Sequence, residues 1–434
     1  MSRFGDFLAQ VRDGFTRTFW IANVIELFER FAYYGSKAIL AVFVAEQVGL
    51  GPEKSGFLVG SLFNGLLYFL PVLAGTVVDR YGFKKSLLAC FSIFCVGYLL
   101  IGLGGLPAGK PLVEALGAEA YMILALLVTA IGGSLIKPSI VGTVARTTTS
   151  ATKGLGYSIY YTLVNLGGAI GPILALQVRE SAGIAYVLVM SSLTSLGLVL
   201  ATLAFFVEPA RPADAPPPKT MGGVLADMLL VFRDLKFMSF LVIFSGFWAM
   251  FWHIFYALPF YVRDVLHFEQ FELIETVDAW TIILVTVPVT ALAKRLSPMA
   301  AMTLGFTLAS GSWFLMGAVP TLTATIGAIV VYALGEGLQA PRYYEYVADL
   351  APKEQIGTYM GFAFLPVAIG TFVAGATSGP LVVHYVGRKI DGIFTPGPAF
   401  AQASHMWYWV GGIGVISTVL MLAYDRLVAR RPAG

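Results

Sequence analysis

Long apolar segments recur along the whole chain, and charged residues, proline or glycine separate each segment from the next. Twelve of them are long enough to cross a bilayer as a helix, which takes about 20 apolar residues. The predicted ranges are 18–47, 55–78, 86–105, 120–144, 156–178, 184–207, 237–262, 273–293, 299–318, 321–348, 356–384 and 405–424. The pattern predicts an all-α polytopic membrane protein with twelve transmembrane helices.

One long polar stretch interrupts this series. Residues 208–236 are rich in proline and carry charges of both signs, a composition typical of a linker. We therefore predict an N-terminal six-helix bundle over 1–207, a cytoplasmic linker over 208–236 and a C-terminal six-helix bundle over 237–434. A weak repeat supports the two halves, because charged connections follow both the second and the eighth span. Repeated halves around a site at the midplane are typical of secondary transporters.

The composition agrees with a membrane protein: 57% of the residues are hydrophobic and 12% are charged, against about 25% charged in soluble domains. A formal net charge of +3 argues against a nucleic-acid partner. The two cysteines, Cys90 and Cys95, lie in one apolar run and predict neither a disulfide framework nor a metal site. No cofactor is expected, and the predicted partners are a small-molecule substrate, protons and membrane lipids.

Most Lys and Arg residues fall in loops on the side of the N-terminus. The positive-inside rule then places both termini in the cytoplasm, and we expect a multi-pass protein of the cell membrane, with a bacterial inner membrane favoured. No Walker-type phosphate-binding loop occurs in the sequence. Transport by this chain would therefore be driven by an ion gradient, and we expect a functional monomer and not an enzyme.

The first span carries an unusual set of polar residues. At roughly 100° per residue they share one helix face. They are Glu26, Glu29, Arg30, Tyr33, Tyr34 and Lys37. Each ionised group at the bilayer centre costs about 2.5–3.5 kcal/mol, so such residues are expected to face a wet cavity and to pair with one another. An alternative is that Glu26 and Arg30 form an i,i+4 salt bridge that only holds helices together.

Other spans add isolated polar residues. Lys137 precedes Pro138 in the fourth span, and its ammonium could reach the acids of the first span. Glu336 lies in the tenth span, His253 in the seventh and Asn165 in the fifth. A carboxylate paired with a cation stays charged, and it takes up a proton once that cation moves to a substrate. Substrate and proton would then compete for shared partners, which couples their binding.

These residues carry a family resemblance. Residues 26–35, ELFERFAYYG, resemble the ExxERFxYYG signature of the proton-dependent oligopeptide transporter (POT) family, within the major facilitator superfamily. The Lys137-Pro138 pair, residues 158–167, Gly335-Glu336 and residues 247–251 are similar to further motifs of that family. The resemblance implies the major facilitator superfamily fold, with two six-helix bundles. It also implies proton-coupled symport by alternating access, with di- or tripeptides or peptide-like compounds as substrates.

The resemblance and the polar pattern together nominate three groups of residues. The proton-coupling candidates are Glu26, Glu29, Arg30 and Lys137. The substrate-binding candidates are Arg30, Tyr33, Tyr34, Lys37, Tyr68, Asn165, Trp248, His253, Glu336 and Arg342. The gating candidates are Asp79, Arg80, Lys84 and Lys85. Arg263 and Asp264 could close an outer gate with Lys54 or could be ordinary interfacial charges.

The chain departs from the family pattern in its second half. His253 stands where the family has Gln, Ala340 stands where it has Ser, and Arg342 adds a cation. An alternative function is therefore open: a proton antiporter that exports drugs or an amino-acid-derived metabolite. The same buried acids would then exchange protons for a cation.

Overall fold

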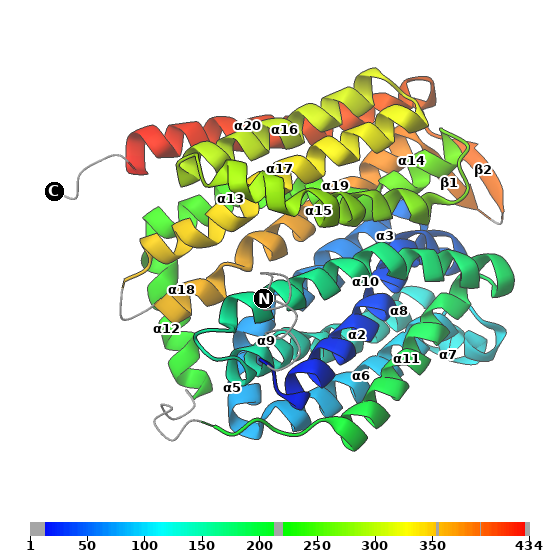
Figure 1. Ribbon diagram of the computed structural model, residues 1–434. Coiled ribbons are helices and arrows are strands. Elements are labelled where there is room, and N and C mark those ends of the chain that lie inside the picture. The colour runs from blue at the N-terminus through cyan, green and yellow to red at the C-terminus, as the bar shows by residue number, and fades with distance from the viewer. Residues whose placement is uncertain (1–13, 212–219, 353–355, 391, 430–434) are drawn as a thin grey trace, which may run out of the picture.

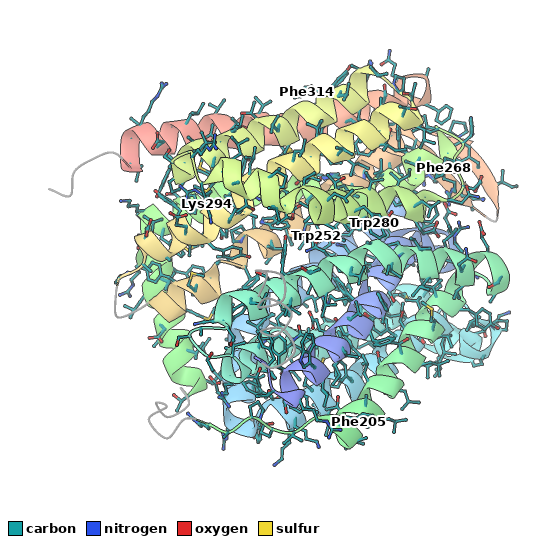
Figure 2. All side chains as sticks on the ribbon, viewed as in Figure 1. Phe205, Trp252, Phe268, Trp280, Lys294 and Phe314 are labelled. Atoms are coloured by element: carbon teal, nitrogen blue, oxygen red, sulfur yellow. The ribbon has the colours of Figure 1, made fainter. Side chains whose placement is uncertain are left out.

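The computed structural model describes residues 14–211, 220–352, 356–390 and 392–429. Figure 1 shows two groups of helices lying side by side, the N-terminal half in blue to green and the C-terminal half in green-yellow to red. Lys294, in a loop predicted to be cytoplasmic, and Phe268, in a loop predicted to lie outside, are at opposite ends of the molecule (Figure 2). The helices therefore run from one end to the other, as spans of a bilayer would.

The N-terminal half begins with the helix that carries the charged face. Its helical elements are α2 (Arg17–Val42), η1 (Phe43–Gln47), α3 (Gly51–Ser55), η2 (Gly56–Asn64), α4 (Gly65–Phe69), α5 (Pro71–Tyr81), α6 (Phe83–Leu103), η3 (Pro107–Gly109), α7 (Lys110–Leu116), α8 (Ala118–Ser134), α9 (Ile136–Thr147), α10 (Lys153–Ala182) and α11 (Ile184–Phe205). The η1 and η2 segments are π-helical. Such segments are rare and often occur at functional sites.

The C-terminal half repeats this plan and adds a short hairpin. Its elements are α12 (Met221–Arg233), α13 (Leu235–Tyr256), α14 (Leu258–Asp264), α15 (Phe271–Ala293), α16 (Pro298–Ala318), α17 (Leu322–Leu350), α18 (Ile356–Phe362), α19 (Leu365–Tyr385), β1 (Gly387–Ile390), β2 (Ile393–Pro396), η5 (Phe400–His405), α20 (Met406–Tyr424) and η6 (Asp425–Ala429). The two strands pair antiparallel, with Gly387 opposite Pro396.

Ten helices of the described residues are long and apolar enough to cross a membrane, or eleven with one bent pair. Helix α2 is not among them, because Glu26, Glu29 and Arg30 fall in every stretch of 18 residues that it contains. It is nevertheless largely buried and packs against α10 and α11. The predicted fold class, an all-α polytopic membrane protein, is confirmed.

Several predicted spans are not single straight helices. The second span bends by 41° between α4 and α5, where Pro71 removes a backbone donor. The fourth span divides into α8 and α9 at Leu135, shortly before Pro138. The predicted linker also contains helix α12, whose N-terminus is capped by Thr220 accepting from the Gly223 amide at 3.1 Å. Residues 212–219 of that linker lie outside the described residues.

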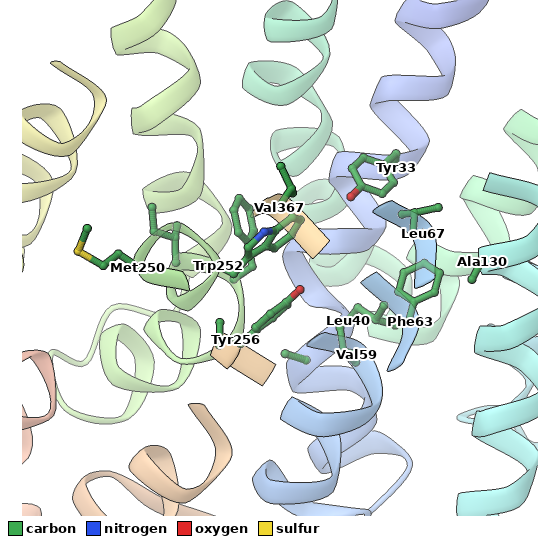
Figure 3. Packing of buried hydrophobic residues seen from close by; sticks show 14 of the residues in the cluster. Tyr33, Leu40, Val59, Phe63, Leu67, Ala130, Met250, Trp252, Tyr256 and Val367 are labelled. Atoms are coloured by element: carbon green, nitrogen blue, oxygen red, sulfur yellow. The ribbon is translucent and has the colours of Figure 1, made fainter. Parts of the chain in front are cut away.

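The two halves meet along a few helix pairs. Helix α10 packs against α15, α2 packs against α13, and α3, η2 and α4 pack against α19. Figure 3 shows Trp252 and Tyr256 of α13 on one side of this interface and Tyr33, Phe63 and Leu67 of the N-terminal half on the other. Aromatic side chains from both halves thus fill the middle of the molecule.

Candidate functional site

The charged face of α2 is a buried ion-pair network. The Arg30 guanidinium lies 2.5 Å from Glu29 Oε2, and its Nε lies 3.4 Å from Glu26 Oε1. Glu26 and Glu29 are at most 2% exposed. One oxygen of each carboxylate, Glu26 Oε2 and Glu29 Oε1, has no hydrogen-bond partner among the described residues. A single guanidinium therefore serves two acids, and each acid keeps one free oxygen.

Lys137 brings the second cation to this network from α9. Its Nζ lies 3.6 Å from Glu26 Oε1 and donates a hydrogen bond of 3.0 Å to the Tyr160 hydroxyl of α10. Tyr160 in turn donates to Glu26 Oε1 at 3.3 Å. The break between α8 and α9 places Lys137 one residue inside the new helix. Three helices of the N-terminal half thus meet at Glu26, and two cations balance two acids.

This network borders a cavity of about 210 Å³. Among the lining residues are Glu29, Arg30, Tyr33, Tyr68 and Lys137. The lining also includes Gly361 and Phe364 of the C-terminal half, near the end predicted to be cytoplasmic. The predicted coupling residues Glu29, Arg30 and Lys137 therefore reach a space that a small solute or water could enter.

A chain of hydrogen bonds connects this cavity to the C-terminal half. The hydroxyl groups of Tyr33 and Tyr68 lie 3.1 Å apart, and Tyr33 donates to Asn64 Oδ1 at 3.5 Å. Asn64 donates from Nδ2 to the Tyr256 hydroxyl at 2.9 Å, and Tyr256 lies 2.6 Å from Thr371 Oγ1. Asn64 is not among the residues predicted for the site. Its polar side chain in the apolar range 55–78 could have indicated a role there.

Lys37, further along α2, occupies an aromatic enclosure. Its Nζ lies 3.4 Å from the ring centre of Phe255, 4.1 Å from that of Trp252 and 5.1 Å from that of Tyr34. Attraction between a cation and aromatic faces stabilises such an arrangement by about 2 kcal/mol or more when the cation is desolvated. Two of these rings come from α13, so Lys37 joins the halves.

Glu336 and two further acids face the site from the C-terminal half. Glu336 of α17 lines a second cavity of about 290 Å³ with Tyr161, Tyr344 and Pro341. Glu275 and Asp278 lie one turn apart on α15, which packs against α10. The sequence analysis missed both, although they interrupt an apolar span in the same way as Glu336.

Ion pairs close the end of the molecule that is predicted to lie outside. Arg179 of α10 pairs with Glu272 of α15, and Arg263 of α14 pairs with Glu46 of η1 and lies 2.8 Å from Asp264. The suggested partner Lys54 instead pairs with Glu119, within the N-terminal half. Arg263 therefore joins the two halves, but with Glu46 as its partner.

We expect Arg263→Ala to lower the thermal midpoint of the purified protein. Arg263 is 9% exposed, and removing one partner of a buried pair costs up to about 3–5 kcal/mol because the remaining charge is uncompensated. The matched control is Lys54→Ala, whose ion pair is half exposed and is expected to contribute less than about 1 kcal/mol. Thermal unfolding in detergent measures both. Equal losses in the two variants would contradict this assignment.

The structure places four substrate-binding candidates in other surroundings. His253 is fully buried, with Nδ1 2.7 Å from the Ala249 carbonyl and Nε2 3.2 Å from Thr377 Oγ1, so both nitrogens have partners between α13 and α19. Asn165 donates to the Tyr161 carbonyl of its own helix at 2.9 Å. The His253 contacts join α13 to α19, whereas the Asn165 bond stays within α10.

Trp248 and Arg342 also contact the protein itself. Trp248 packs against Phe251 and against the backbone at Gly370. Arg342 pairs with Glu345 and donates to the Leu296 carbonyl at 2.6 Å, at the end of the C-terminal half predicted to be cytoplasmic. Arg342 therefore connects α17 to the loop between α15 and α16.

The gating candidates lie at the end of α5 and the start of α6, on either side of Gly82. Asp79, Arg80 and Lys85 are exposed, and Lys84 donates from Nζ to the Leu203 carbonyl at 3.1 Å. Glu208, which the sequence analysis assigned only to the linker, accepts from the backbone amides of Phe83 and Lys84 at 2.8 and 2.6 Å. A carboxylate at a helix N-terminus is stabilising, so Glu208 ties the start of the linker to α6.

Comparisons with known proteins agree with this fold. The family model described as Major Facilitator Superfamily matches residues 22–375. Dipeptide and tripeptide permease B of Edwardsiella piscicida is 29% identical over 44% of this chain and 36% of its own length. The di-/tripeptide transporter of Lactococcus lactis subsp. cremoris is 27% identical over 48% of this chain and 42% of its own length. The matched regions are thus less than half of these relatives.

Solved structures with the same fold cover nearly the whole chain. A POT family transporter in complex with 5-aminolevulinic acid superimposes with a TM-score of 0.74 at 17% identity, over 94% of this chain and 96% of that one. The peptide transporter POT in complex with sulfate gives 0.73 at 18% identity, over 95% of each chain. The predicted resemblance to the POT family is confirmed. The relatives are transporters and not enzymes. The chain belongs to the Major Facilitator Superfamily.

Proposed function

We propose that this chain is a proton-coupled symporter of small zwitterionic or carboxylate-bearing solutes, with di- and tripeptides or peptide-like compounds as its main substrates. The observation that carries the proposal is the network of Glu26, Glu29, Arg30 and Lys137 at a cavity between the halves. The names of the matched relatives support the substrate class. Cations on the N-terminal half suit a carboxylate, and Glu336 on the other half suits an ammonium group.

Proton coupling follows from shared partners in this network. Arg30 and Lys137 together balance two carboxylates, and each carboxylate has one oxygen without a partner in the part of the chain that the structure describes. When a substrate carboxylate takes Arg30 or Lys137 as its partner, one acid is left uncompensated in a low-dielectric site and binds a proton instead. Substrate and proton therefore enter together, and each favours the binding of the other.

Alternating access requires the closed end to open. Arg179–Glu272 and Arg263–Glu46 hold the halves together at one end, and the cavity extends toward Gly361 and Phe364 near the other. With the termini in the cytoplasm, as the positive-inside rule places them, this arrangement corresponds to a state that faces the cytoplasm. Opening the outer end then separates these two ion pairs, and rigid-body rocking of one half against the other performs the exchange.

We also propose a functional monomer in the cell membrane, with both termini in the cytoplasm. The bacterial origin of the matched relatives supports a bacterial inner membrane. The hydrogen-bond chain from Tyr68 to Thr371 and the substrate cavity lie within one chain, so a second copy is not needed to complete the site.

We expect proteoliposomes with an acidic exterior and a negative interior to accumulate a labelled dipeptide such as alanyl-alanine. The proton gradient supplies the driving force, so a protonophore should reduce uptake to the equilibrium level. Empty liposomes give the background. Dipeptide uptake that is insensitive to a protonophore would contradict coupling. Absence of dipeptide uptake together with drug resistance on expression would favour the antiporter.

A further inference from the structure

Three carboxylates of the C-terminal half face a single cation. Glu275 and Asp278 lie on α15 and Glu336 on α17. Helix α15 packs against α17, which carries Glu336, and against α2, which carries Lys37, and all three acids are close enough to Lys37 for their charges to act on it. The cluster therefore carries two more negative than positive charges when every member is ionised.

Lys37 does not pair with any of these acids. No carboxylate of the described residues lies within 4.0 Å of its Nζ, which instead rests on the rings of Phe255 and Trp252. The cation–π contacts and the aromatic enclosure hold the ammonium away from α15. The acids are thus close enough to sense Lys37 but lack a direct ion pair.

Glu275 is the acid of this cluster with the fewest hydrogen-bond partners among the described residues. It is 4% exposed, and neither of its side-chain oxygens has a hydrogen-bond partner among the described residues. Its neighbour Glu272, one turn away, is also buried but is paired with Arg179. Burial of an unpartnered carboxylate is costly, and buried polar atoms without partners in a native structure call for an explanation such as a ligand or ion.

Asp278 connects Glu275 to the substrate region. It is half-buried, and its Oδ1 also lacks a hydrogen-bond partner among the residues described. Ile282, one turn beyond Asp278 on α15, and Tyr161 of α10 both line the cavity that Glu336 borders. A ligand at Glu336 therefore lies beside the helix that carries Asp278 and, one turn further along, Glu275.

We propose that Glu275 and Asp278 bind a second cationic group of the solute, so that this transporter prefers peptides with a lysyl or arginyl side chain. This inference rests on the proposed function. If Glu336 takes the α-ammonium group, Lys37 is near both α15 acids but directly paired with neither, and the basic side chain supplies the direct ion pair that they lack. A neutral dipeptide leaves one acid uncompensated, and an acidic dipeptide adds a further repulsive charge.

The test is competition for uptake of labelled alanyl-alanine by lysyl-alanine, alanyl-alanine and glutamyl-alanine. We expect lysyl-alanine to compete at a concentration at least about 10-fold lower than alanyl-alanine, since a hydrogen bond to a charged partner contributes this much or more. Glu275→Gln and Asp278→Asn should each reduce that ratio toward one. Glu269→Gln, an exposed acid in the loop before α15, is the matched control and should keep the ratio of the unmodified protein.

Three results would overturn the inference. The first is equal competition by all three dipeptides in the unmodified protein. The second is a lower proton-to-peptide ratio in both variants with the lysyl preference intact, which would make the pair a proton site. The third is an equal loss of thermal stability in both variants with the preference intact, which would make the pair structural.

A binding measurement tests this cationic site independently of transport. The quantity measured is the rise in the thermal midpoint of the purified protein when 1,5-diaminopentane is added, compared with the rise for 1-aminopentane. This measurement does not require uptake. A larger shift with the diamine that Glu275→Gln removes supports the cationic site even if no dipeptide is transported. Equal shifts with the two amines would count against the site, whereas failed dipeptide uptake alone would count against the proposed function.

Discussion

Lys137→Ala is expected to abolish proton-driven accumulation of dipeptide. Lys137 Nζ lies 3.6 Å from Glu26 Oε1 and shares Tyr160 with it. Without this ammonium, Arg30 is left as the cation for both Glu26 and Glu29. Two carboxylates around one cation would leave a buried charge uncompensated, which costs about 3–5 kcal/mol. This cost favours the protonated form of one acid by more than about 100-fold, so that acid keeps its proton in every conformation.

Two transport measurements separate coupling from binding in this variant. Uptake driven by a proton gradient should fall to the level of empty liposomes, while exchange of labelled for unlabelled dipeptide, which moves no net proton, should persist. Lys153→Ala, an exposed lysine at the start of α10, is the control and should accumulate dipeptide normally. If Lys137→Ala still accumulated dipeptide against its gradient, the role of Lys137 in coupling would be wrong.

Gly60→Ala is expected to shift the protein away from the state in which its outer end is closed. A Cβ at Gly60 would lie 2.4 Å from Gly375 Cα and 2.7 Å from Tyr256 Cε2. Two helices from different halves leave no room for it. Overpacking costs about 1–3 kcal/mol, which corresponds to a shift of about 5- to 150-fold toward separation of η2 from α19.

Labelling of an introduced cysteine can measure this shift. Ser61 donates to the Phe372 carbonyl at 2.7 Å across the same interface, so Ser61→Cys reports on its opening. A membrane-impermeant maleimide should label this cysteine faster when Gly60→Ala is added, and dipeptide uptake should fall. Gly65→Ala is the control, because its Cβ would meet only the Gly60 carbonyl at 3.9 Å. Identical labelling in both would show that the close approach does not limit opening.

Local patterns in the sequence were sufficient for the fold class and for one face of the site. Apolar length predicted the spans, and the shared face of Glu26, Glu29 and Arg30 predicted a network that the structure places at Arg30. The breaks within the second and fourth spans were less predictable, because residues 55–78 and 120–144 were each predicted to form a single helix. Proline weakens a helix locally, but the packing around it decides whether the helix bends, by 41° in one case.

Single polar residues in the C-terminal half were harder to interpret. His253 and Glu275 both interrupt apolar spans, and a hydropathy profile treats them alike. The structure gives both nitrogens of His253 a partner, whereas both oxygens of Glu275 lack one within the described ranges. That difference depends on Thr377 and on the neighbours of α15, which are distant in sequence. A polar residue is functional or structural according to its partners, which one helix alone does not specify.

The sequence by itself determined that this chain spans a membrane and which helix carries the charged face. Those properties depend on the cost of moving each residue into lipid and on helical periodicity, and both are local. Only the tertiary structure decided that Lys137 joins Glu26, that Arg263 pairs with Glu46, and that three acids face Lys37. Ion pairs and cavities depend on distances between helices that are remote in sequence, so packing of the two halves had to bring them together.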